Sequence, residues 1–259
     1  MTDAGNNRFR AVICDIDGCL SPEDSSAFDT PKLAQVYAHN RRAIETGTGP
    51  IVTACSGRPI AFVEAMCRLI GNDRLPAIGE NGVWIYDPVR NEMEIDPAIA
   101  SEHREAIRQL ETWVRSQWVP RGVAIQPGKA ASVSLWHADT RFLLDELLPI
   151  VKGEVDRHGW PMRISNTWFY INCDLDFISK ATAIKRWMER TGMAPSQLAG
   201  IGDTLSDLKI RDEVSWFGCP ANADERLREV ADFVAPHEQA EGVLDILDAL
   251  SGNSSEVVA

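Results

Sequence analysis

The sequence lacks any run of about 18 apolar residues, the length that a helix needs to cross a membrane. The segment from Met1 to Arg10 also lacks the apolar stretch of a secretory signal peptide. These two absences predict a protein that has no membrane as a partner, and they make the cytoplasm its expected location.

Basic side chains are scarce. The chain has 26 Lys and Arg residues against 38 Asp and Glu residues, for a net charge of −12. This excess of negative charge argues against nucleic acid and against an anionic membrane surface as partners, because both would repel it. A small anionic substrate stays possible, since a local site on an acidic protein can still be positive.

Cysteine is sparse and scattered. The six cysteines form no C-x-x-C pair, and no cluster of His and Cys has the spacing of a zinc site. We therefore expect reduced thiols, as in a cytosolic protein.

Neither of the two common nucleotide-binding loops is present. Gly200 and Gly202 lack the third glycine of G-x-G-x-x-G. Gly128-Lys129 is followed by alanine, and position 123 is valine, so the P-loop pattern also fails. A nucleotide-binding module is thus a weak alternative.

What is present is an ordinary globular composition over 259 residues, with 44% hydrophobic and 25% charged side chains. Short apolar strands alternate with amphipathic helices over residues 9–79 and again over 180–250, which predicts a doubly wound, parallel-sheet α/β fold. Between them, over 97–173, the order changes to α-β-β-α-β-β. That order predicts an α+β unit, a four-stranded antiparallel sheet covered by two helices.

The pattern also predicts how the chain divides. A discontinuous core domain is expected first, an inserted domain second, and flexible tails at both ends. These parts are 8–86 with 178–250, then 87–177, then 1–7 and 251–259.

Two acidic residues stand where a predicted buried strand ends. The strand runs from Phe9 to Cys14, and Asp15-Ile-Asp17-Gly18 follows it directly. In open α/β sheets, ligands bind at the carboxyl ends of the strands, and Gly18 allows a sharp turn there. Two carboxylates in so small a space repel each other unless a cation or a proton lies between them. A pair of solvated loop acids beside a turn glycine is the alternative.

A second predicted strand, Leu198 to Ile201, is followed by a similar segment. Asp203 and Asp207 come after a glycine, and the first turn of the helix expected there can hold both carboxylates on one face. Oxygen ligands drawn from Asp15, Asp17 and Asp203 would suit magnesium. Helix capping by Asp203 is the alternative for this segment.

Two further segments indicate a binding site for an anion. Ser56-Gly57-Arg58 ends another predicted strand, and a helix begins at Pro59, so a hydroxyl and free backbone N–H groups can form a phosphate cradle. Lys180 begins a later helix, where its charge opposes the helix dipole. That misfit indicates an anionic neighbour. The alternatives are a surface Arg58 and a solvated Lys180.

These segments together resemble the haloacid dehalogenase (HAD) superfamily of aspartyl-phosphate phosphatases. The four motifs occur in the family's order and cover nearly the whole predicted core. They are VICDIDG, then Ser56 in CSGR, then Lys180 in FISK, then Gly202, Asp203 and Asp207 of G-D-x-x-x-D.

Two other stretches resemble the branch called Cof-type, which carries a large cap between the second and third motifs. They are GENG at 79–82 and PANADERLREVADFV late in the chain. The resemblance implies a Rossmann-like HAD core with the α-β-β-α-β-β unit as its inserted α+β cap. Cys19 stands where the family usually has threonine. Because cysteine is small and weakly hydrogen-bonding, we expect fine tuning there and no loss of activity.

The resemblance implies covalent catalysis in two steps. Asp15 would attack phosphorus as the nucleophile, and Asp17 would protonate the leaving oxygen and then activate water. Ser56 and Lys180 would bind the phosphoryl group. A magnesium ion is also implied. Its site would be drawn from Asp15, the Asp17 carbonyl, Asp203 and Asp207, and Asp207 would orient the other ligands.

Substrate contacts are expected on both predicted domains. Those at the phosphate are Ser56, Gly57 and Arg58, and those on the cap or hinge are Asn81, Lys129 and His137. Each of the last three has a plain alternative: a turn residue, a solvated hairpin lysine and a histidine ending a strand at the surface.

The combined prediction is a magnesium-dependent phosphomonoester hydrolase that acts on a sugar phosphate or a similar small phosphorylated metabolite. A sugar phosphomutase of the same superfamily uses the same cap class and the same D-x-D, and the residues do not exclude it. A phosphorylated receiver-type module also combines aspartates, a hydroxyl and a lysine, but it is much shorter and orders them differently. Oligomeric state is not readable from the pattern.

Overall fold

The computed structural model describes residues 8–167 and 169–252. Flexible tails are predicted at 1–7 and 251–259, and of these positions 1–7 and 253–259 lie outside the described residues. Positions 251 and 252 form the end of helix α8 (Gln239–Gly252). Among the helices of the described residues, none is both long enough and apolar enough to cross a membrane. All six cysteines are free and buried.

A five-stranded parallel sheet forms the centre of the core, in the order β12-β11-β10-β1-β2. Its strands are β12 (Phe233–Val234), β11 (Phe217–Cys219), β10 (Leu198–Ile201), β1 (Ala11–Cys14) and β2 (Ile51–Ala54). Every residue of β1 is buried, as its unbroken apolar run predicts for a strand covered on both faces.

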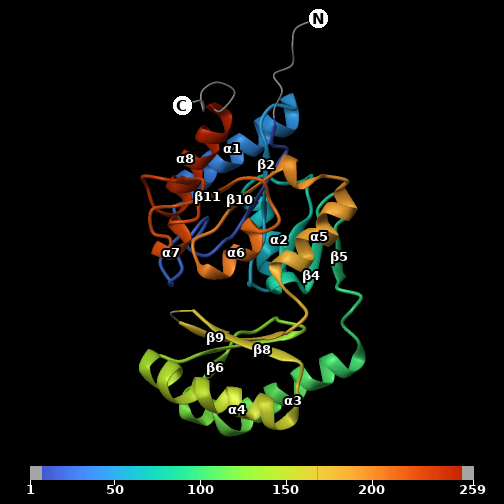
Figure 1. The fold of residues 1–259 in the computed structure, drawn as a ribbon, viewed down its shortest axis with the longest axis vertical. Coiled ribbons are helices and arrows are strands. Elements are labelled where there is room, and N and C mark those ends of the chain that lie inside the picture. Colours follow the sequence, from blue (N-terminus) through green and yellow to red (C-terminus); the bar gives the residue numbers. More distant parts are fainter. Residues whose placement is uncertain (1–7, 168, 253–259) are drawn as a thin grey trace, which may run out of the picture.

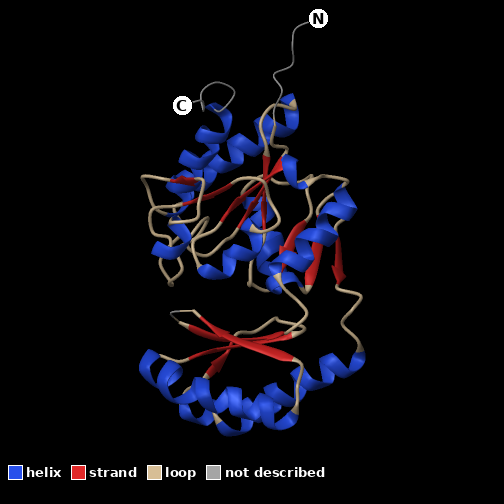
Figure 2. Ribbon diagram, in the orientation of Figure 1, coloured by secondary structure: helices blue, strands red, loops and turns tan. Residues whose placement is uncertain are grey.

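Helices cover both faces of this sheet (Figure 2). Alternate residues of β1 point to opposite sides. Val12 and Cys14 pack with α1 (Thr30–Thr46), α2 (Ile60–Leu69) and α8, whereas Ala11 and Ile13 pack with α5 (Lys180–Thr191) and α6 (Leu208–Arg211). The fold is therefore doubly wound, as the alternating pattern predicts.

A small antiparallel sheet extends the core beyond β2. It consists of β3 (Ala77–Gly79), β4 (Trp84–Asp87) and β5 (Glu92–Ile95), and one bridge from Cys55 to Ile78 joins it to the main sheet. The sequence pattern shows β3 but not the β4–β5 hairpin, because β5 is mostly exposed and acidic. Arg190 of α5 pairs with Asp87 and Glu94, which holds the hairpin on the core.

The inserted segment has the predicted order α-β-β-α-β-β. It contains α3 (Ser101–Gln117), β6 (Ala124–Ile125), β7 (Ser132–Trp136), a π-helical stretch (Phe142–Leu147) continuing into α4 (Leu148–His158), β8 (Met162–Asn166) and β9 (Tyr170–Leu175). The four strands form an antiparallel sheet in the order β6-β7-β9-β8. Helix α3 begins later than Pro97 because Asp96 accepts hydrogen bonds from the N–H groups of Ala98 and Ile99 in a turn.

The cap sheet faces the core, and its two helices lie on the far side (Figure 1). Val133 and Leu135 of β7 are buried in the cap's own hydrophobic cluster, under the helices. Ser134, between them, points to the opposite, core-facing side, where it donates a hydrogen bond to Asn172 of β9. A polar sheet face is therefore turned toward the carboxyl ends of the core strands. The division of the chain at 87 and 177 remains a proposal.

Candidate active site

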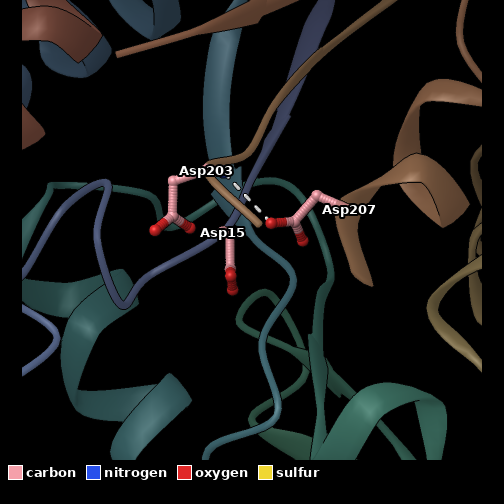
Figure 3. A group of neighbouring side chains, drawn as sticks. All are labelled: Asp15, Asp203 and Asp207. Atoms are coloured by element: carbon pink, nitrogen blue, oxygen red, sulfur yellow. Dashed lines mark hydrogen bonds between the residues drawn. The ribbon is translucent and has the colours of Figure 1, made fainter. Parts of the chain in front are cut away.

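Three buried carboxylates meet where β1 and β10 end (Figure 3). These strands pair in parallel with Cys14 opposite Ile201, so the residues that follow them, Asp15 and Gly202-Asp203, leave the sheet side by side. One oxygen from each of Asp15, Asp203 and Asp207 lies within 4.8 Å of the others. The exposed fractions of the three residues are 7%, 4% and 0%.

Glycines allow these carboxylates to approach the backbone. Gly18 has φ +75°, and a Cβ added to it would come 1.8 Å from Oδ2 of Asp203. A Cβ on Gly202 would come 2.2 Å from the Cβ of Asp207. The loops can therefore close around the acids only because both positions lack a side chain. Cys19 lies in the same loop, with its sulfur 3.9 Å from Oδ1 of Asp203.

Lys180 is the cation of this cluster. Its Nζ lies 3.0 Å from Asp15 Oδ1 and 2.6 Å from Asp207 Oδ1, and the residue is 4% exposed. Ser179 caps α5 by accepting a hydrogen bond from the Thr182 N–H, which fixes Lys180 at the first position of the helix. The anionic neighbours that the sequence predicts for Lys180 are these two aspartates.

Asp207 is occupied by protein donors on both oxygens. Its Oδ2 accepts hydrogen bonds from the N–H groups of Asp203 and Thr204 and from the Thr204 hydroxyl, and its Oδ1 accepts from Lys180. The dashed line in Figure 3 marks the bond from Asp203. Asp207 thus holds the Asp203 loop and the lysine in place.

The cluster carries more negative than positive charge. Burial raises the pKa of Asp15 to about 7 and that of Asp203 to about 9, and the neighbouring carboxylates add to both shifts. Burial alone would lower the pKa of Lys180, but Asp15 and Asp207 outweigh it, and the pKa rises. Oδ1 of Asp15 is buried, and its partner within the described residues is the ammonium of Lys180 in the ion pair. Three carboxylates with one ammonium are a donor set that fits a hard divalent cation.

Asp17 lies apart from the three-acid cluster. Its carboxylate accepts hydrogen bonds from Nε and Nη2 of Arg58, at 2.8 and 2.5 Å. The guanidinium of Arg58 also lies over the ring of Phe62, and the Arg58 N–H donates to Ser56 Oγ. The side chain of Asp17 is therefore held by the Ser56–Arg58 loop and not by the three-acid cluster.

The three predicted cap or hinge contacts are placed differently. The Asn81 amide donates to Asp174 of β9, at 3.1 Å. Lys129 donates to Ser134 on the core-facing side of the cap sheet. His137 contacts Phe142, Asp139 and the Gly122 turn, all within the inserted segment. The structure thus brings Asn81 and Lys129, but not His137, to the seam between cap and core.

Two acids at this seam are not among the site residues predicted from the sequence. Glu80 is 1% exposed and Asp174 is 4% exposed, and each bonds across the seam. The sequence signal for Glu80 lies in GENG itself, and that for Asp174 is a charged residue within an apolar strand pattern.

Comparisons with known proteins place the chain in a family. Residues 143–247 match the haloacid dehalogenase-like hydrolase family. An Archaeoglobus fulgidus protein named phosphoglycolate phosphatase is 43% identical over 248 residues, which cover 93% of this chain and 96% of that protein. The chain belongs to the haloacid dehalogenase-like hydrolase family. The predictions of this superfamily and of a phosphatase enzyme are confirmed.

Solved structures share the hydrolase's fold. One from Thermoplasma acidophilum has a TM-score of 0.73 at 20% identity and covers 93% of this chain and 98% of its own. A Plasmodium vivax protein assigned as HAD/COF-like has a TM-score of 0.72 at 15% identity, with coverage of 96% and 98%. These likenesses show that the chain shares its overall fold with these proteins.

The contact between Gly18 and Asp203 predicts a specific loss. Gly18→Ala should lower the phosphatase rate by about 10²-fold, because the new methyl group displaces the Asp203 carboxylate. Gly47→Ala is the matched control, since Gly47 has φ +68° with no atom within 4 Å of an added Cβ. The control should lose about 1–2 kcal/mol of stability from the left-handed backbone and keep its rate. Equal rates in the two variants, measured beside their urea unfolding curves, would contradict the role of this contact.

Proposed function

We propose that this phosphatase is a magnesium-dependent phosphomonoester hydrolase that forms an aspartyl-phosphate at Asp15. The observation that carries the proposal is the buried Asp15, which lies beside Lys180 and Asp203 at the ends of two neighbouring strands. A carboxylate in that position is a nucleophile held next to a positive charge that can receive a phosphoryl group.

The chemistry assigned to the chain's own residues follows in two steps. An oxygen of Asp15 attacks phosphorus, the bond from phosphorus to the ester oxygen breaks, and Asp17 donates a proton to that oxygen. Asp17 then takes a proton from a water molecule, which attacks phosphorus and releases phosphate from Asp15. Arg58 orients Asp17 for both transfers through its paired hydrogen bonds. Lys180 and Ser56 would bind the phosphoryl oxygens.

The acid cluster is the proposed magnesium site. Asp15, Asp203 and the Asp17 carbonyl would hold the ion, while Asp207 orients Asp203 and Lys180. When bound, magnesium offsets the charge of the phosphoryl group and of the acids around it.

A small phosphorylated carboxylic acid is the first substrate candidate, because the 43% identical relative is named phosphoglycolate phosphatase. The cap offers a matching group. Burial lowers the pKa of Lys129, the nearby Asp174 and Glu80 carboxylates oppose that shift, and the positive Arg58 across the seam adds to it. A second anionic group on the substrate would pair with Lys129 and stabilise its charged form. A sugar phosphate is the second candidate, favoured by the polar cap face around Ser134 and Asn172.

Metal removal tests the proposal. Purified protein with magnesium should release inorganic phosphate from a panel of phosphoglycolate, sugar phosphates and p-nitrophenyl phosphate, with the two-carbon acid turned over fastest. Exhaustive chelation should reduce release to background, and added magnesium should restore it, because three buried carboxylates cannot accept an anionic phosphate without a cation.

Two other outcomes would count against the proposal. Full activity after chelation would reject the magnesium site. An isomeric sugar phosphate formed without inorganic phosphate would favour the phosphomutase over the hydrolase.

A further inference from the structure

A turn of unusual backbone geometry joins the Ser56–Arg58 loop, the proposed phosphate-binding loop, to the cap. Glu80, Asn81 and Gly82 follow one another with φ +48°, +53° and +118°. Residues other than glycine rarely adopt this left-handed backbone conformation. It persists only where several surrounding contacts hold it in place. At Gly82 an added Cβ would come 2.5 Å from the carbonyl oxygen of Ser179, so a side chain is excluded there.

The backbone of this turn is bonded to the phosphate-binding loop. The Glu80 N–H donates to the carbonyl of Arg58, and the Asn81 N–H donates to the carbonyl of Ser56, both at 3.0 Å. The Asn81 amide also lies against Gly57, where an added Cβ would come 3.0 Å from its oxygen. The turn therefore holds both ends of the Ser56–Arg58 loop.

The two side chains of the turn are bonded to the cap instead. The Glu80 carboxylate accepts hydrogen bonds from the Ala130 N–H, at 2.9 and 3.0 Å, and from the Ala131 N–H, at 3.3 Å. These two residues precede β7. The Asn81 amide donates to Oδ2 of Asp174 in β9. The central strands of the cap sheet are thus both tied to one turn of the core.

Burial makes these contacts strong. Glu80 is 1% exposed and Asp174 is 4% exposed, so neither carboxylate can exchange its protein partners for water while the cap is in place. Oδ1 of Asp174 is buried and has no hydrogen-bond partner within the described residues. The carboxylate is therefore stabilised through Oδ2, by the hydrogen bond from Asn81 and by an ion pair with Arg163 at 3.9 Å.

We infer that Glu80 and Asn81 are positioning residues that couple the cap to the phosphate-binding loop. Closing the cap seats the Glu80 and Asn81 side chains, and the same turn then sets the geometry of Ser56 and Arg58. The reaction assigned to those residues rests on the proposed function, whereas the coupling itself is a property of the free protein.

The coupling can be tested by exchanging donor and acceptor in the hydrogen bond between Asn81 and Asp174. Asn81→Asp places a carboxylate against Asp174, and the repulsion should release the cap. Asn81→Asp combined with Asp174→Asn restores a bond of the same shape with donor and acceptor exchanged. Asn91→Asp is the matched control, because Asn91 also has φ +53° but lies exposed in the β4–β5 hairpin. Glu80→Gln weakens the other contact with little change in size, because it removes the charge and replaces one of the two acceptor oxygens with an N–H donor.

Hydrogen exchange of the free protein gives the first readout. Amide exchange over 129–132 should rise about ten-fold or more in Asn81→Asp and in Glu80→Gln, return toward wild type in the double variant and stay unchanged in Asn91→Asp. Unchanged exchange in Asn81→Asp, or no recovery in the double variant, would overturn the coupling.

Kinetics with magnesium gives the second readout. In Asn81→Asp, kcat should fall about ten-fold or more for both phosphoglycolate and p-nitrophenyl phosphate, and the double variant should recover most of it. A change in KM alone would overturn the link to the phosphate loop and leave Asn81 as a simple substrate contact. If the wild type releases no phosphate yet the exchange pattern holds, the proposed function fails and the coupling stands.

Discussion

Asp15→Asn should abolish phosphate release while the protein stays folded. We expect a loss of more than about 10³-fold, which corresponds to roughly 4 kcal/mol of transition-state stabilisation. The reason is that an amide cannot attack phosphorus, whereas the carboxylate of Asp15 lies 3.0 Å from the ammonium of Lys180 at the end of β1. Steady-state rates on phosphoglycolate and p-nitrophenyl phosphate, with the melting temperature of each protein, give the measurement.

Asp24→Asn is the control for this substitution. Asp24 lies exposed in the loop that follows β1 and accepts a hydrogen bond from the Ser26 N–H. The Asp24→Asn variant should therefore release phosphate at the rate of the wild type. Acid-quenched wild type should also carry phosphate bound to Asp15, and the variant should carry none. Retention of more than about a tenth of the wild-type rate would remove Asp15 from the role of nucleophile.

Lys180→Met should cost both activity and stability. The variant leaves the buried Asp15 and Asp207 without their counter-ion, and removing one partner of a buried ion pair costs about 3–5 kcal/mol. We expect the rate to fall by at least about 10²-fold, because a positive charge at the phosphoryl group is lost. Urea unfolding of chelated protein measures the first effect, and phosphate release with magnesium measures the second.

Lys185→Met separates this effect from the loss of any lysine in α5. The Lys185 side chain is 61% exposed and pairs with Glu213, so its removal should change stability by less than about 0.5 kcal/mol. Magnesium should also stabilise Lys180→Met more than the wild type, since the ion replaces the missing positive charge. If the two methionine variants unfold alike, Lys180 is not the counter-ion of the cluster.

The sequence by itself determined the layers of the fold and the chain positions of the chemistry. Unbroken apolar runs such as Ala11–Cys14 specify strands covered on both faces, and the acids that follow them must lie at one edge of a parallel sheet. The α-β-β-α-β-β order of the cap was equally readable, because helical and strand periodicities are local properties. The β4–β5 hairpin was not, since β5 lacks a buried face to mark it.

Only the tertiary structure decided which side chains meet. Lys180 and Asp207 come from separate elements and become partners through the packing of α5 against α6, which begins directly after Asp207. The pairing of Asp17 with Arg58 and of Glu80 with the cap backbone depends in the same way on loops brought together from distant parts of the chain. A motif specifies a residue's place along its own strand or helix, but burial and the nearest opposite charge choose its partner, and these exist only once the sheets and helices have packed.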